Sequence, residues 1–163
     1  MSEKVKILFC AANPADIHQL DLDVEAREIE EKMQFGTNRD SFELISHWAV
    51  RPTDLTRILL KHQPHIVHFS GHGTRTKQIV LEDNDGNSHV VSKQALASLF
   101  KVLKDNVRIV VFNACFSKTQ AAELTDTIDY TIGMSKAVGD RAAITFAAAF
   151  YRRVDGLLMR IMD

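Results

Sequence analysis

Two stretches of the sequence decide the fold: IVHFSGHG (residues 66–73) and VRIVVFNACFS (residues 107–117). Each contains a run rich in Val, Ile and Phe, which is typical of a strand buried on both faces. Each run ends in small and polar residues, and the glycines of the first stretch permit an unusual turn there. Such strands are typical of a parallel sheet covered by helices, so the sequence predicts an α/β fold.

The rest of the chain alternates in the same way between apolar runs and segments of helical period. Further parallel strands are predicted at residues 5–11, 42–50 and 130–134, and a hairpin outside the parallel pattern at residues 78–82 and 88–91. Helices are predicted at residues 23–33, from a cap at Thr53 or Asp54 to a stop at Pro64, from a cap at Ser92 to Leu103, and at residues 119–125 and 140–154. We expect residues 1–163 to form one domain with a mostly parallel central sheet flanked by helices, in which residues 154–163 are an atypical or truncated end that forms a final short helix.

Composition excludes several classes of protein function. The chain has 163 residues, 45% of them hydrophobic, and a net charge of −1, so it can bury a core and has no basic surplus for binding nucleic acid. The first apolar run is too short for a signal peptide, and no later run approaches a membrane span. Only two cysteines occur, both in or beside apolar runs, so we expect a reducing, cytoplasmic location without a disulfide framework.

The two deciding stretches also carry the candidate chemistry. Because the carboxyl ends of parallel strands gather at one edge of a sheet, His72 and Cys115 are expected to emerge side by side. A cysteine attacks carbonyls as its thiolate, and a neighbouring imidazole takes its proton and later delivers it to the leaving amine. Gly73 follows the histidine without a side chain to obstruct its N–H. With the N–H of Cys115 it is expected to form a two-donor oxyanion hole.

Several segments together resemble one known family. HFSGHG (residues 68–73) and FNACFS (residues 112–117) resemble the caspase-like cysteine peptidases, and more closely the bacterial CHAT domains. ILFCAANP, LDLDVEAREIEE and TIGMSKAVGDRAAITFAAAFYRR also resemble the opening and closing segments of CHAT domains, so the likeness extends to about Arg153. Matches in the same order along a chain are more specific than any one short motif.

The resemblance implies a caspase-like three-layer fold and a thiol endopeptidase that cleaves protein substrates without a metal or an organic cofactor. It assigns His72 as general base and Cys115 as nucleophile. In caspase relatives the residue two before the nucleophile lines the pocket for the side chain preceding the scissile bond, and here that residue is Asn113. Caspases have Gln there and metacaspases have Asp, so the preferred substrate residue stays open. CHAT domains are often joined to sensor modules, which implies a regulated role in bacterial stress, defence or cell death under a separate sensor protein.

Other residues have competing interpretations. Asp140 follows Gly139 and precedes a helix, so it is either an N-cap or a substrate-binding residue. Cys10 is interpreted as a packing residue within its strand. The four histidines between residues 62 and 72 cannot share one helical face, and no Cys or carboxylate completes a metal site, so no metal is expected. His68 is expected to be an interior histidine. Ser70 and Ser117 are expected to shape their loops.

Two other functions remain as alternatives. A caspase-like domain that is catalytically silent would act as a protein-interaction scaffold or regulator. A nucleotide-binding hydrolase is disfavoured because Ala11–Pro14, rather than a glycine-rich phosphate loop, follows the first strand. The acidic and basic run from Glu25 to Lys32 is interpreted as a solvent-exposed surface rather than a site. The segment Thr74–Gln78 and the loop around Asp85 are candidates for ordering upon activation, since they have few apolar anchors.

Overall fold

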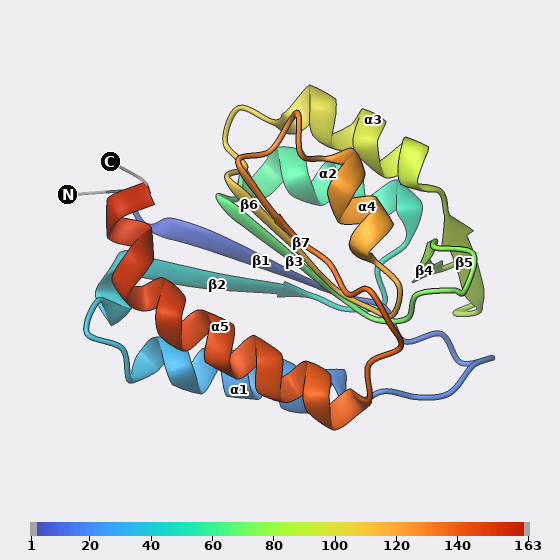
Figure 1. Cartoon of the computed structure of the whole chain (residues 1–163), viewed down its shortest axis with the longest axis horizontal. Helices are drawn as coiled ribbons and strands as arrows, with labels where there is room; N and C mark the ends of the chain where they lie inside the picture. Colours follow the sequence, from blue (N-terminus) through green and yellow to red (C-terminus); the bar gives the residue numbers. More distant parts are fainter. Residues whose placement is uncertain (1–2, 162–163) are drawn as a thin grey trace.

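The computed structural model describes residues 3–161, with side chains through residue 156. Seven strands alternate with five α-helices and one short 3₁₀ helix along the described chain (Figure 1). The elements are β1 (Val5–Ala11), α1 (Leu22–Gln34), η1 (Arg39–Ser41), β2 (Phe42–His47), α2 (Pro52–His62), β3 (Ile66–Ser70), β4 (Ile79–Glu82), β5 (Ser88–Val91), α3 (Lys93–Leu103), β6 (Ile109–Asn113), α4 (Lys118–Glu123), β7 (Tyr130–Ile132) and α5 (Asp140–Ile161).

The central sheet has five strands in the order β2-β1-β3-β6-β7, and every neighbouring pair is parallel. The chain moves from β1 outward to β2 and then returns to β3 on the other side of β1, so the strand order reverses there. Functional groups of open parallel sheets collect at the carboxyl ends of strands near such a reversal. The predicted parallel sheet is confirmed, and β3, which precedes His72, is its middle strand.

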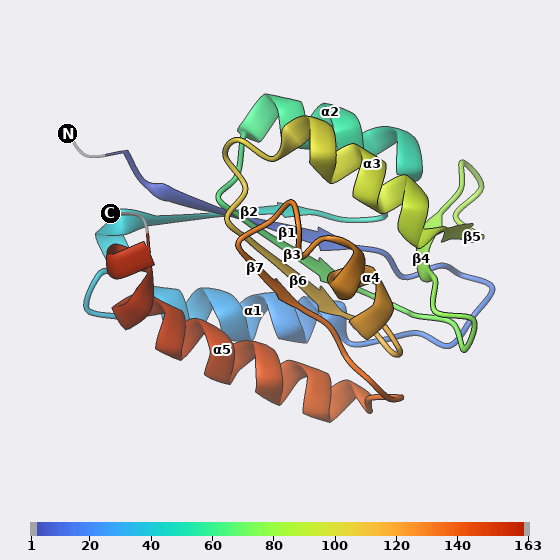
Figure 2. The same cartoon turned by 45° about the horizontal axis from the view of Figure 1, so that its top comes forward.

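Helices cover both faces of the sheet, which gives the expected three layers (Figure 2). Helices α1 and α5 lie side by side on one face, and α2, α3 and α4 lie on the other. Alternate residues of β1 serve the two cores, because successive side chains of a strand point to opposite faces. Leu8 and Cys10 pack toward α2 and α3, whereas Ile7 and Phe9 pack toward α1 and α5.

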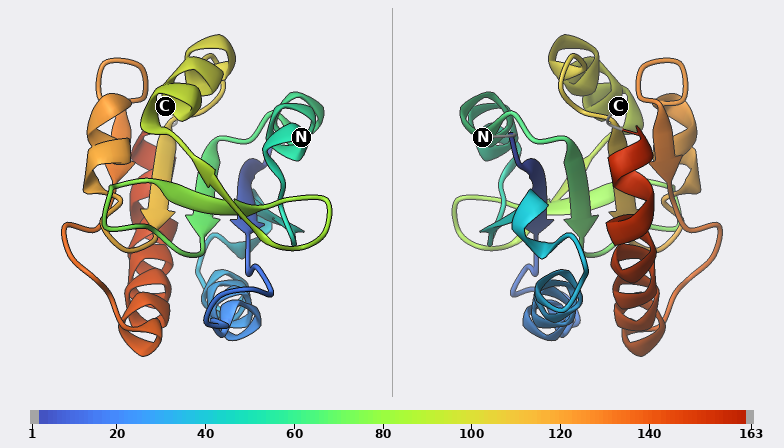
Figure 3. Two further views of the ribbon diagram at one scale, coloured as in Figure 1. Left: turned by 90° about the vertical axis from the view of Figure 1, so that its right-hand side faces the viewer. Right: turned by 90° about the vertical axis from the view of Figure 1, so that its left-hand side faces the viewer.

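The antiparallel hairpin β4–β5 lies outside the sheet, as predicted, and crosses in front of the carboxyl ends of its strands (Figure 3, left). Backbone hydrogen bonds fasten it to the sheet edge: the Val80 N–H donates to the His72 carbonyl at 3.0 Å, and the Glu82 N–H donates to the Val50 carbonyl at 3.0 Å. The hairpin therefore holds the chain directly at His72.

Helix α1 differs from the prediction that its charged run is a solvent-exposed surface. Its charged run is not wholly exposed, because the Glu25 side chain is buried, with only 1% of its surface exposed. Glu25 lies three residues after Leu22 and four before Ile29, and both of those residues belong to the buried stripe. This spacing places the carboxylate on the inward face of the helix.

The carboxyl-terminal segment also differs from its prediction. Residues beyond Val154 do not form a separate short helix, because α5 continues without a break to Ile161. No proline interrupts this stretch. The last two residues of the predicted final helix lie outside the described residues. Between residues 3 and 161, no helix is both long enough and apolar enough to cross a membrane.

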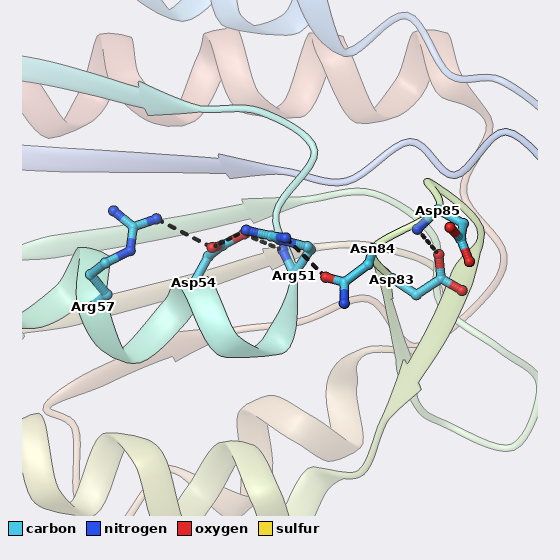
Figure 4. A network of polar contacts seen from close by, with 6 residues as sticks. All are labelled: Arg51, Asp54, Arg57, Asp83, Asn84 and Asp85. Atoms are coloured by element: carbon cyan, nitrogen blue, oxygen red, sulfur yellow. Dashed lines mark hydrogen bonds and ion pairs between the residues drawn. The ribbon is translucent and has the colours of Figure 1, made fainter.

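The start of α2 carries a polar network around Asp54 (Figure 4). The N-cap is Arg51 rather than Thr53 or Asp54, with Pro52 in the first turn. Asp54 nevertheless serves the helix start, because its Oδ2 accepts the Arg51 N–H at 3.1 Å and the Arg51 Nε–H at 2.9 Å. Its Oδ1 accepts from Arg57 at 3.2 Å. Hydrogen bonds from Arg51 hold the pKa of Asp54 well below its usual range.

Asp54→Asn is expected to lower the free energy of unfolding by about 1 kcal/mol at neutral pH, since it removes a charged cap contact. Because the pKa of Asp54 is lowered on folding, its contribution is present above the carboxyl's unfolded value near 4 and is lost as the pH falls through the lowered value. Urea denaturation at pH 7 and pH 3 measures both effects. Asp85→Asn is the matched control in an exposed loop, and an equal loss in both variants would contradict the prediction.

Candidate active site

The loops that follow β3 and β6 meet at one small cavity at the carboxyl edge of the sheet. His72 follows β3 by two residues, Cys115 follows β6 by two residues, and both line this cavity of about 30 Å³. Gly71 and Asn113 are also part of its lining. The cavity has room for about one water molecule. A larger apolar cavity of about 470 Å³ lies along β7 and α5, and neither His72 nor Cys115 lines it.

His72 is partly buried and is oriented by a backbone carbonyl. Its Nε2 lies 2.6 Å from the carbonyl oxygen of His18. A carbonyl only accepts, so Nε2 carries the hydrogen of this bond, and the neutral ring leaves Nδ1 as the acceptor. Burial lowers the pKa of His72 below its ordinary value of 6.5, although the bond to His18 opposes this shift. The imidazole is therefore neutral at pH 7 and can accept a proton.

Cys115 is partly exposed, and its sulfur faces the loop before α5. The Val138 N–H donates to Sγ at 3.2 Å, and Sγ lies 3.6 Å from the Val138 carbonyl oxygen. The next residue, Phe116, has a φ of 57°, a left-handed conformation uncommon for a residue with a large side chain. Such strained residues cluster at functional sites. Within the described chain, no hydrogen bond joins the side chains of His72 and Cys115.

The second cysteine has the opposite environment. Cys10 is the second-last residue of β1 and has none of its surface exposed, and burial raises its pKa to about 12. A thiol that is buried and protonated is inert. The interpretation of Cys10 as a packing residue is confirmed.

Gly73 packs directly on the backbone of Cys115. A Cβ added at Gly73 would lie 1.8 Å from the Cys115 carbonyl oxygen, so no larger residue fits without movement of the chain. Neither the Gly73 N–H nor the Cys115 N–H donates a hydrogen bond within the part of the chain that the structure describes. Two unused donors on adjacent loops are available to a developing oxyanion.

Asn113 and Asp140 both line the cavity, and both are engaged with other parts of the chain. Asn113 is 3% exposed, and its Nδ2 donates to Glu25 Oε1 at 2.6 Å and to the Ala143 carbonyl at 3.0 Å. Its Oδ1 is buried without a partner among the described residues. Asp140 Oδ2 accepts the Asp21 N–H at 2.9 Å, so it fastens the segment before α1 to the start of α5.

Two contributors to this region were missed by the sequence analysis. Glu25 lines the cavity, and its spacing along α1 was the available signal. His18 contributes through its backbone carbonyl, which any residue could supply, so its side chain gave no signal. His68 is an interior histidine, as expected: it is fully buried, with Nε2 2.8 Å from Glu25 Oε1 and Nδ1 2.9 Å from the Tyr151 hydroxyl.

The loop serines behave differently from one another. Ser117 shapes its loop, as expected: its hydroxyl hydrogen has the carbonyl oxygens of Phe112 and Ala114 within hydrogen-bond distance, and its oxygen accepts the Met134 N–H at 2.9 Å. Ser70 donates to the Glu25 carboxylate. Over residues 3–161 there is no group of three or more His, Cys, Asp or Glu side chains that could hold a metal ion.

The fold and the residues at its carboxyl edge define a caspase-like α/β domain. A solved structure with this arrangement is a secreted C11 cysteine protease from Bacteroides thetaiotaomicron, in complex with an irreversible peptide inhibitor. It superimposes with a TM-score of 0.65 at 12% identity, over 95% of this chain and 54% of that one. At this identity the likeness establishes the fold.

The family follows from the sequence comparison: residues 2–160 match the CHAT domain, and the chain belongs to that family. A "Roc-COR-CHAT protease" of an unknown prokaryotic organism is 28% identical over 90% of this chain. A second protein of that name from Runella zeae is 25% identical over 91% of it, and a "Probable protease" of Gillisia limnaea is 24% identical over 89%. The chain spans only 14%, 16% and 26% of these relatives, respectively.

Proposed function

We propose that the chain is a CHAT-type cysteine endopeptidase that hydrolyses peptide bonds in protein substrates, with Cys115 as nucleophile and His72 as general base. One observation carries the proposal: both residues line the same cavity, and the bond from His72 Nε2 to the His18 carbonyl leaves Nδ1 as the proton acceptor. The protease names of the relatives and the caspase-like fold support it.

In the proposed reaction His72 Nδ1 takes the Sγ proton of Cys115, and the thiolate attacks the carbonyl carbon of the substrate. The carbonyl electron pair moves to oxygen, where the N–H groups of Gly73 and Cys115 stabilise the negative charge. Collapse breaks the C–N bond, and His72 returns its proton to the leaving amine. Water then gives a proton to His72 and cleaves the thioester, which releases the acid and restores the thiol.

We propose that Cys115 and His72 already act as a pair in this structure, and that only the space for substrate is closed. About 30 Å³ holds a water molecule but not a substrate side chain, so substrate binding requires movement of the rim. Asp140 and Asn113 are proposed to contact the substrate once this rim opens. A separate sensor protein is the proposed trigger, in a bacterial cytoplasmic role in stress, defence or cell death. The segment Thr74–Gln78 and the hairpin loop around Asp85 are proposed to reorder upon activation.

A second function is favoured by the same cavity. A domain in which no described hydrogen bond joins the side chains of His72 and Cys115, and whose cavity is this small, also fits a catalytically silent interaction module, which acts as a scaffold or regulator. The two proposals differ in one measurable property, the reactivity of Cys115.

We expect His72→Ala to slow alkylation of Cys115 by iodoacetamide at least ~10-fold at pH 7, because the base that removes the thiol proton is lost. In the native chain, the part of the rate that depends on His72 should persist at pH 6.5 and decline at lower pH. The sign follows from the pKa: burial lowers the pKa of His72, so the imidazole stays neutral below its ordinary titration range. Mass spectrometry after proteolysis resolves the two cysteines.

Cys10 is the internal reference for this experiment, since it stays unlabelled while the core is intact. Equal alkylation of Cys115 in the native chain and in His72→Ala would reject the endopeptidase proposal and favour the silent module. No substrate is needed for either result.

A further inference from the structure

We infer that Glu25 is a positioning residue of the proposed peptidase site: its buried carboxylate holds together the ends of β3 and β6, and thereby sets where His72 and Cys115 lie. The inference rests on the proposed function of these two residues. It assigns a role in the reaction to a glutamate of α1 that touches neither of them by a hydrogen bond.

The contacts of the Glu25 carboxylate join the two strands that lead to the site. Oε2 accepts the Ser70 hydroxyl, which comes from the last residue of β3. Oε1 accepts Asn113 Nδ2 at 2.6 Å, from the last residue of β6. Ser70 and Asn113 are partners in the register of β3 and β6, and each stands two residues before a candidate catalytic residue.

Backbone bonding at this end of the strand pair is weak. Beyond the register, the Gly71 N–H donates to the Asn113 carbonyl at 3.4 Å, near the limit for a hydrogen bond. The chains then diverge toward His72 and Cys115. The Glu25 carboxylate adds charge-assisted hydrogen bonds where the backbone hydrogen bonding between β3 and β6 ends. Charge-assisted hydrogen bonds are shorter and stronger than neutral ones.

The remaining contacts fix the carboxylate itself. His68 Nε2 lies 2.8 Å from Oε1, and His68 Nδ1 lies 2.9 Å from the Tyr151 hydroxyl of α5. Burial and the charge of Glu25 raise the pKa of Tyr151 well above its usual value, so the phenol stays protonated. Asn113 also bonds the Ala143 carbonyl of α5 at 3.0 Å. The network therefore spans α1, β3, β6 and α5, and α1 and α5 lie side by side beneath the sheet (Figure 2).

A buried carboxylate is costly unless donors satisfy it, and here three side chains donate to it. Glu25→Gln replaces one acceptor oxygen with an NH₂ group that faces existing donors. The negative charge is lost, so the hydrogen bonds from Asn113 and His68 to Oε1 are no longer charge-assisted, and the Ser70 hydroxyl must accept where it donated. With these links weakened, the loops that carry His72 and Cys115 move relative to each other. Displacements of about 1 Å at a reacting pair reduce rates by up to about 100-fold.

The test measures alkylation of Cys115 against pH in the native chain, His72→Ala, Glu25→Gln, Glu25→Asp and Glu31→Gln. Glu31 is the matched control, because it is an exposed glutamate of the same helix. We expect Glu25→Gln to slow the His72-dependent part of Cys115 alkylation at least ~10-fold. Glu25→Asp should recover part of this rate, and Glu31→Gln should match the native chain. All rates are taken well below each variant's melting temperature, so reduced stability alone does not change the dependence on His72.

The outcomes separate the two proposals. If Glu25→Gln keeps the native pH profile and the native dependence on His72, the inference about Glu25 is overturned and the proposed function stands. If His72→Ala leaves the native rate unchanged, the proposed function fails and the inference fails with it. Labelling of Cys10 in Glu25→Gln would reveal unfolding. Ser70→Ala then decides, because it cuts one link and leaves the carboxylate two donors; a native rate in that variant overturns the inference.

Discussion

Cys115→Ala is expected to abolish peptide-bond hydrolysis, a loss of at least ~10⁴-fold in kcat/KM, because it removes the thiol proposed to form the acyl intermediate. His72→Ala is expected to lower kcat/KM by about 10²- to 10⁴-fold, since the thiol then lacks its proton acceptor. Both variants should keep the native melting temperature within a few degrees, because both side chains lie at the cavity rim rather than in either core. Cleavage is measured by mass spectrometry of new amino termini in a peptide library.

Cys10→Ala is the matched control for the loss of a thiol. It removes a buried sulfur and lowers stability modestly, but it leaves the cavity untouched. We expect it to retain activity below its melting temperature. Substantial cleavage by purified Cys115→Ala, or loss of cleavage in both cysteine variants alike, would be incompatible with Cys115 as the nucleophile.

Gly73→Ala is expected to cause the next largest loss after the two catalytic variants, on the order of 10²-fold in kcat/KM, comparable to removal of one oxyanion donor. The new Cβ would lie 1.8 Å from the Cys115 carbonyl oxygen and 3.2 Å from its nitrogen. These atoms belong to the Cys115 backbone, so no flexible side chain can make room for the new Cβ. Either the Gly73 segment after β3 or the Cys115 loop must move, and the distance between the two proposed donors changes with it.

Gly139→Ala is the control for this prediction. Gly139 lies next to Asp140 at the same edge of the molecule, and an added Cβ there meets no atom within 4 Å. We expect Gly139→Ala to keep native kinetics. A lower kcat with an unchanged KM in Gly73→Ala would indicate that Gly73 stabilises the transition state. Equal kinetics for Gly73→Ala and Gly139→Ala would show that Gly73 is not part of the oxyanion hole.

Much of the fold was predictable from local patterns. The runs at Val5–Ala11 and Ile66–Ser70 are mostly apolar and almost wholly buried, which is typical of strands covered on both faces, as in a helix-covered parallel sheet. The cap at Ser92 was predictable from residue type and is confirmed, since its hydroxyl accepts the Ala95 N–H at 3.1 Å. The length of α5 was underestimated, because nothing in an apolar tail marks the residue at which a helix ends.

The order of strands and helices, the CHAT family, and the two strand ends next to His72 and Cys115 could all be predicted from the residues along the chain. These properties depend on residue type and on short-range spacing, which a chain carries before it folds. The hydrogen-bond partners of His72 and of Glu25 could not be predicted in this way. The His18 carbonyl lies 54 residues from His72 along the chain, and the donors to Glu25 lie 43, 45 and 88 residues away from it. Such contacts arise on folding, because packing of α1 and the segment before it against the sheet brings a buried carboxylate and a backbone carbonyl to places that no local pattern specifies.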